Sequence, residues 1–93
     1  MGVVMSKINK YAVTEYTEDA YPKLHKKVGS VGLKAIQDHD RDSADIVAKL
    51  SECDEVIYVG YSEVKSSLPE TIASFVDCKN GKRFYVINRQ VEK

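Results

Sequence analysis

Short groups of apolar residues, separated by polar stretches, divide the chain into a series of predicted strands and helices. The first is a strand over residues 8–16, where β-branched and aromatic side chains are frequent. A helix should follow, because Thr17 is a good N-cap and apolar side chains recur at helical spacing up to Val28, although Pro22 is tolerated only in a first turn and favours a start near Ala20. Gly29 can then end this helix in the left-handed conformation.

Residues 30–38 are compatible with two structures. Their apolar side chains alternate as in a strand, but a spacing of four also permits a short helix, and we favour the strand. The polar run at 38–42 should end whichever element precedes it. A helix over 44–53 is then expected, because Ser43 is a suitable N-cap and the apolar residues form one stripe.

The second half of the chain predicts strand, helix and strand. Residues 56–59 form a continuous apolar, β-rich run, which is typical of a central strand buried on both faces. Ser-Leu-Pro-Glu at 67–70 has the pattern of a capping box with proline in the first turn, and it predicts a helix over 68–79. A last strand is expected over 83–88.

One alternative to the third helix stays open. Asn80-Gly81 is a strong indication of a β-hairpin, whose strands would lie between residues 71 and 88. We favour the helix, because the capping box, the proline position and the helical spacing agree. The expected order is therefore β-α-(β)-α-β-α-β. This order predicts an α/β fold with a mostly parallel sheet of three or four strands and helices packed on it, and α+β is the alternative.

Length and composition indicate one small domain over residues 1–93, with flexible ends at 1–6 and 89–93. Hydrophobic residues make up 43% of the chain and charged residues 30%, which is an ordinary globular balance. Fourteen basic and 14 acidic residues give a formal net charge of zero, which argues against binding to nucleic acid or an anionic membrane. We expect a cytoplasmic protein in which Cys53 and Cys78 are free thiols.

The predicted parallel sheet indicates where a ligand would bind. In such sheets, ligands lie outside the carboxyl ends of the strands, and two polar loops should meet there. Their side chains mix imidazole nitrogen with carboxylate oxygen, which suits a divalent metal, and a phosphate is the other candidate ligand. We give greater weight to the alternative that these residues form a solvated charged loop, and we predict no cofactor. The candidate ligands are Asp38, His39, Asp40, Asp42 and Glu63.

Six tyrosines are many for a chain of this length. Tyrosine is enriched at protein interfaces, so Tyr11, Tyr16 and Tyr61 are candidate interface residues, although each could instead pack at the edge of the core. The first predicted strand could also pair with a second copy along an exposed edge.

No convincing nucleophile–base pair or metal-ligand spacing stands out in the chain. The expected function is therefore a non-enzymatic binding or protein-interaction module, acting with a protein partner or by self-association as a homodimer. The alternative is a small metal- or phosphate-dependent enzyme or ligand-binding protein, with its site at the carboxyl edge of the sheet. Nucleic-acid binding ranks third, because it depends only on Lys23, Lys26 and Lys27.

Overall fold

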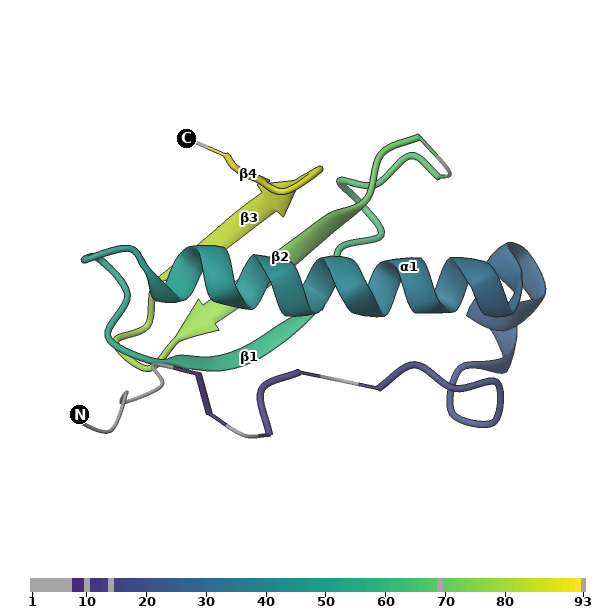
Figure 1. The fold of residues 1–93 in the computed structure, drawn as a ribbon, viewed down its shortest axis with the longest axis horizontal. Coiled ribbons are helices and arrows are strands. Elements are labelled where there is room, and N and C mark those ends of the chain that lie inside the picture. The colour runs from purple at the N-terminus through teal and green to yellow at the C-terminus, as the bar shows by residue number, and fades with distance from the viewer. Residues whose placement is uncertain (1–7, 10, 14, 69, 93) are drawn as a thin grey trace, which may run out of the picture.

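A long helix lies across one face of a four-stranded sheet (Figure 1). The computed structural model describes residues 8–9, 11–13, 15–68 and 70–92. The protein is a small single domain with an α+β fold, and the predicted α/β fold with a mostly parallel sheet and several helices is wrong. Its elements are α1 (Pro22–Ala48), β1 (Val56–Tyr61), β2 (Ala73–Cys78), β3 (Arg83–Ile87) and β4 (Gln90–Val91).

The sheet follows the order of the chain, β1-β2-β3-β4, and each neighbouring pair in it is antiparallel. Phe75 on β2 lies opposite Gly60 on β1 and Tyr85 on β3. The hairpin alternative between residues 71 and 88 is therefore correct, and the predicted helix over 68–79 is wrong. The connections from β2 to β3 and from β3 to β4 are short, which requires antiparallel pairing because parallel strands need a long crossover.

The Asn-Gly pair forms the turn of the β2–β3 hairpin. Gly81 has a φ of 94°, a conformation that glycine adopts without steric cost. The Gly81 N–H donates to the carbonyl of Cys78 at 2.9 Å, and the Cys78 N–H donates to the carbonyl of Lys82 at 2.8 Å. Beyond β3, Gln90–Val91 pair with it as β4, although this end was predicted to be flexible. The other predicted flexible end, residues 1–6, lies outside the described residues.

Helix α1 replaces several of the predicted elements. It begins at Pro22 rather than after Thr17, and it continues past Gly29 through a kink, where φ is 74° and ψ is 177°. The strand predicted over 30–38 and the break at 38–42 are wrong, and the helical alternative for 30–38 is correct. The helix predicted over 44–53 is confirmed as far as Ala48, but as the end of α1 rather than as a separate helix. The buried face of the helix is broken by three polar residues, which disguised its periodicity. Its buried residues are Leu33, Ile36, His39, Asp40, Ser43, Ala44 and Val47.

The segment before the helix runs along the outer edge of β1 (Figure 1). Within the described part of residues 8–16, only isolated parallel bridges form, from Ile8 to Val56 and from Val13 to Val59, so the predicted strand is wrong. The strand at 56–59 is confirmed as part of β1. Its predicted central, doubly buried position is wrong, because β1 is the first strand of the sheet and the side chains of Ile57 and Tyr58 are 42% and 43% exposed.

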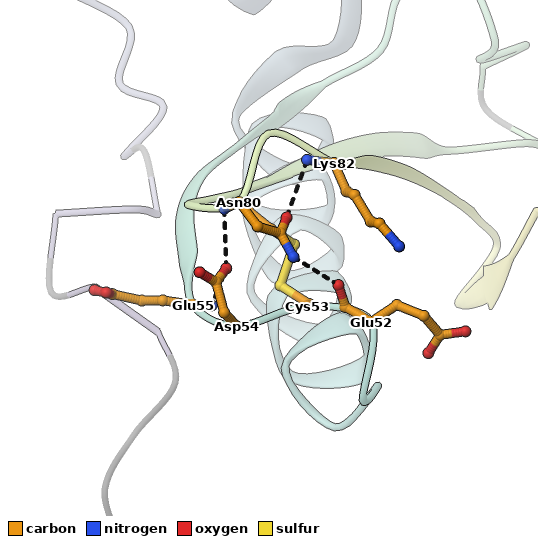
Figure 2. The surroundings of a disulfide bond; sticks show 7 residues. Glu52, Cys53, Asp54, Glu55, Asn80 and Lys82 are labelled. Atoms are coloured by element: carbon orange, nitrogen blue, oxygen red, sulfur yellow. Dashed lines mark hydrogen bonds between the residues drawn. A yellow bond between two sulfur atoms is a disulfide. The ribbon is translucent and has the colours of Figure 1, made fainter.

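A disulfide joins the chain after α1 to the end of β2. Cys53 and Cys78 are bonded with their Cα atoms 5.6 Å apart, so the predicted free thiols are wrong. Figure 2 shows the Asn80 side chain beside this bond: its Nδ2 donates to the Glu52 carbonyl at 2.9 Å, and its backbone N–H donates to Asp54 Oδ1 at 3.0 Å. Together these bonds hold the two loops at this end of the sheet against each other.

The predicted cytoplasmic location stays a prediction, and a structural disulfide is more typical of an oxidising compartment. Within the described residues, no helix combines the length and the apolar character that a bilayer crossing requires.

Candidate functional site

A cluster of polar side chains lies buried between α1 and the sheet. We call it the buried polar cluster. His39, Asp40 and Ser43 of α1 and Ser74 of β2 are fully buried, and Tyr16 reaches the cluster from the segment before the helix. Buried polar groups are costly unless each is hydrogen-bonded, so the partners of these side chains determine what the cluster can do.

The hydrogen bonds form one continuous chain. His39 Nε2 accepts from the backbone N–H of Arg89 at 3.1 Å, which places the imidazole proton on Nδ1. Nδ1 lies 2.7 Å from Ser74 Oγ and therefore donates to it, and the Ser74 hydroxyl donates to Asp40 Oδ1. The Tyr16 hydroxyl donates to Asp40 Oδ2 at 2.6 Å and accepts from the backbone N–H of Tyr61 at 3.0 Å.

Burial sets the protonation of the cluster. It lowers the pKa of His39 to about 4, with a further contribution from the positive charge of Arg89. Burial raises the pKa of Asp40 to about 6, although hydrogen bonds from Ser74 and Tyr16 act in the opposite direction. The pKa of Tyr16 is raised by burial and by the neighbouring Asp40 charge. At neutral pH the cluster therefore holds a neutral imidazole, a carboxylate and a protonated phenol.

Serine, histidine and aspartate are the residue types of nucleophilic catalysis, but their order here does not suit that chemistry. A catalytic histidine accepts the proton of the serine hydroxyl. Here His39 donates to Ser74, and the Ser74 proton points to Asp40. Ser74 is also fully buried, so a substrate cannot approach its oxygen. The described residues contain no buried side-chain nitrogen or oxygen that lacks a partner. The cluster is arranged to hold the helix on the sheet.

Two of the predicted ligand residues, His39 and Asp40, meet in this cluster through Ser74. Asp42 borders the cluster, because it accepts from Arg89 Nε at 2.8 Å and the Arg89 N–H donates to His39. The other two lie elsewhere: Asp38 forms an ion pair with Lys34 at 3.4 Å, and Glu63 is exposed after β1. The five residues were expected to meet at the carboxyl ends of parallel strands. The observed strands are antiparallel, so no such common edge exists among β1, β2 and β3.

Across the part of the chain that the structure describes, no three His, Cys, Asp or Glu side chains are grouped so as to hold a metal.

An open groove adjoins the buried polar cluster at Tyr16, between the segment leading into α1 and the β1 end of the sheet. Its volume is about 660 Å³, and we call it the aromatic groove. Five rings from three separate parts of the chain line it: Tyr16, Tyr21, Tyr58, Tyr61 and Phe75. Its size is within the range of known ligand pockets, and its lining is mainly apolar, as in such pockets.

The local sequence explains the shape of the groove. Gly60 leaves room for the ring of Phe75 on the neighbouring strand, because a Cβ at this position would lie 2.7 Å from Phe75 Cζ. Tyr58 packs beside Phe75 with their ring centroids 5.6 Å apart. On the opposite wall, the rings of Tyr16 and Tyr21 lie 4.9 Å apart. Four of the five rings therefore support one another in two pairs.

The predicted interface tyrosines divide between two places. Tyr16 and Tyr61 both line the groove and are joined by a hydrogen bond. Tyr11 is 79% exposed and lies on the segment beside β1. Sequence reasoning missed Tyr58 and Phe75, although the hairpin alternative, once extended to a third strand, would have placed them on one face of the sheet.

No protein-family model matches this chain, and the searches of curated proteins and of solved structures give no significant match.

Proposed function

We propose that this protein is a small non-enzymatic binding module that holds a short segment of a partner protein in the aromatic groove. The observation that carries the proposal is the grouping of five aromatic side chains around an open hollow of about 660 Å³. Aromatic side chains dominate the energy of protein interfaces because they bury large areas at a low cost in side-chain entropy.

The contrast with the buried polar cluster supports a binding role rather than a catalytic one. Within the buried polar cluster, the side chains of His39, Asp40 and Ser74 have mutually satisfied hydrogen bonds and no exposure. The groove, by contrast, combines apolar rings with access to solvent. A partner that inserts an apolar side chain would gain free energy from burial, at about 25 cal/mol per Å² of apolar surface.

The wall formed by Tyr16 is also held in place before any partner binds. Its hydroxyl is fixed by Asp40 at 2.6 Å and by the Tyr61 backbone at 3.0 Å. Pre-organised side chains lose little conformational entropy on binding, which favours affinity. The buried polar cluster thus has a second effect, since it orients one wall of the groove.

Selection of random peptides by display on the wild-type protein tests this proposal. The affinity of an enriched peptide would then be measured by fluorescence anisotropy for the wild type, Tyr58→Ala and Ile57→Ala. Tyr58 lines the groove and Ile57 does not, although the two side chains are almost equally exposed. We expect Tyr58→Ala to weaken binding about tenfold or more, as at an interface hot spot, and Ile57→Ala to leave it unchanged.

Two results would contradict the proposal. In one, no peptide is enriched, or the two variants bind the enriched peptide equally well. In the other, sedimentation shows a wild-type dimer that Tyr58→Ala dissociates, which would make a second copy of this chain the occupant of the groove.

A further inference from the structure

We infer that the segment recognised by the groove is acidic: an apolar side chain flanked by carboxylates that face Lys23 and Lys27. This inference rests on the proposed function and adds the chemistry of the partner. It is carried by the placement of charge around the groove, which is uneven.

The positive charge lies on the helix wall. Lys23 and Lys27 both line the groove and both are exposed. They are four residues apart in the first two turns of α1, so they lie on the same side of that helical segment. Two ammonium groups next to aromatic rings form a site for a carboxylate-bearing segment with an apolar anchor.

The ion pairs of the described residues do not include Lys23 or Lys27. Among the described residues, no carboxylate lies within ion-pair distance of either ammonium group, whereas Lys34, Lys65 and Arg83 each have an acidic partner. A partner carboxylate would therefore form a new ion pair without breaking an existing one.

Glu63 adds one negative charge to the lining of the groove. It is exposed and lines the groove from the loop after β1. Its charge would repel an acidic group bound near it. The carboxylates of the partner should therefore lie at the lysine wall, and neutral or basic groups should lie near Glu63.

The same arrangement disfavours a single-stranded nucleic acid. Such a strand carries a phosphate on every nucleotide and binds best along a continuous positive track that follows its backbone. The groove offers two lysines on one wall and a carboxylate among its other lining residues. A peptide can place its negative charges at one position only, so it fits the charge pattern better.

The test uses the random-peptide library sorted separately on three proteins: the wild type, Lys23→Glu/Lys27→Glu, and the control Lys26→Glu. Lys26 is exposed on the same turn but does not line the groove. We expect peptides enriched on the wild type and on the control to carry an aromatic or branched apolar residue with Asp or Glu beside it. We expect the double variant to bind the wild-type peptides about tenfold more weakly, because each exposed ion pair contributes a few-fold and reversal adds repulsion.

The outcomes separate this inference from the proposed function. Groove-binding peptides without a preference for acidic residues, or with affinity unchanged in the double variant, would overturn the acidic chemistry and leave the binding role intact. Failure to enrich any peptide would overturn both. Displacement of the bound peptide by an oligonucleotide of 12 thymidines at low micromolar concentration would make a nucleic acid the better occupant. Weakening of peptide binding between 50 and 500 mM salt, roughly as screening predicts, would support the inference.

Discussion

Asp40 and His39 should make opposite contributions to the pH dependence of stability, and separating them tests the buried polar cluster. The pKa of Asp40 is raised from 3.8 to about 6, so the folded state binds a proton more readily than the unfolded state. As pH rises through this range, the contribution of Asp40 falls by roughly 3 kcal/mol, at about 1.36 kcal/mol per pH unit.

His39 acts with the opposite sign. Its pKa is lowered from 6.5 to about 4, so the unfolded state takes up a proton that the folded state excludes. As pH rises from about 4 to 6.5, the contribution of His39 to stability increases by roughly 3 kcal/mol. In the wild type the two contributions nearly cancel over this range.

Two substitutions expose these contributions. Asp40→Asn removes the Asp40 contribution, which in the wild type falls as pH rises. The unfolding free energy of this variant minus that of the wild type should therefore rise by about 3 kcal/mol between pH 4 and 6. His39→Gln removes the His39 contribution, which in the wild type increases as pH rises. The unfolding free energy of this variant minus that of the wild type should therefore fall by a similar amount between pH 4 and 6.5. Urea unfolding at half-unit pH steps measures both differences, and all other titrating groups cancel in the comparison. Two pH profiles with slopes of the same sign, or two flat profiles, would refute the assignment of both groups.

Three further substitutions test other features of the fold. Replacing Cys53 and Cys78 with serine should lower the unfolding free energy in urea by roughly 3.5 kcal/mol, because the disulfide closes a sequence separation of 25 residues; an unchanged midpoint would contradict this. Gly29→Ala should destabilise by about 1–3 kcal/mol in the same assay, because its φ of 74° with ψ of 177° is accessible almost only to glycine; a stabilising effect, as in a regular helix, would show that the kink is absent. Gly60→Ala should displace the Phe75 ring and weaken the binding of a groove-selected peptide about tenfold by anisotropy, at an overpacking cost of about 1–3 kcal/mol; unchanged affinity would mean that the ring does not shape the site.

The parts of the fold that sequence could predict are those where local pattern and tertiary environment agree. Continuous β-rich runs located β1 and β3, and Asn80-Gly81 marked the hairpin turn. The helix predicted over 68–79 followed from a capping-box pattern, whose Pro69 lies outside the described residues. The alternation of β2 was hidden because Ser74 occupies a core-facing position that apolar residues normally fill.

The same cluster hid the length of α1. His39, Asp40 and Ser43 lie on the buried face of the helix, where sequence patterns treat polar residues as a break. The burial of His39 and Asp40 is favourable because Ser74 and Tyr16, distant in sequence, complete their hydrogen bonds. A short stretch of sequence does not show which distant residues will complete these hydrogen bonds. The polar run at 38–42 was therefore predicted to break the helix.

The disulfide and the groove depend on topology in the same way. Cys53 and Cys78 come together because β2 returns next to β1, whereas the prediction of free thiols depended only on the expected compartment. Tyr58 and Phe75 share a face only in the observed register. Sequence composition indicated that tyrosines matter, but their arrangement required the correct order of strands.

The central claim is that the buried polar cluster supports the fold whereas the aromatic groove binds the partner. An amide chemical-shift map of the protein, titrated with a selected peptide, tests both halves of the claim in one measurement. We expect saturable shifts at the amides of Tyr21 and Gly60, which line the groove, and none at the amide of Arg89, which donates to His39. Shifts centred on Arg89 and Asp42, with the groove amides unmoved, would contradict the claim.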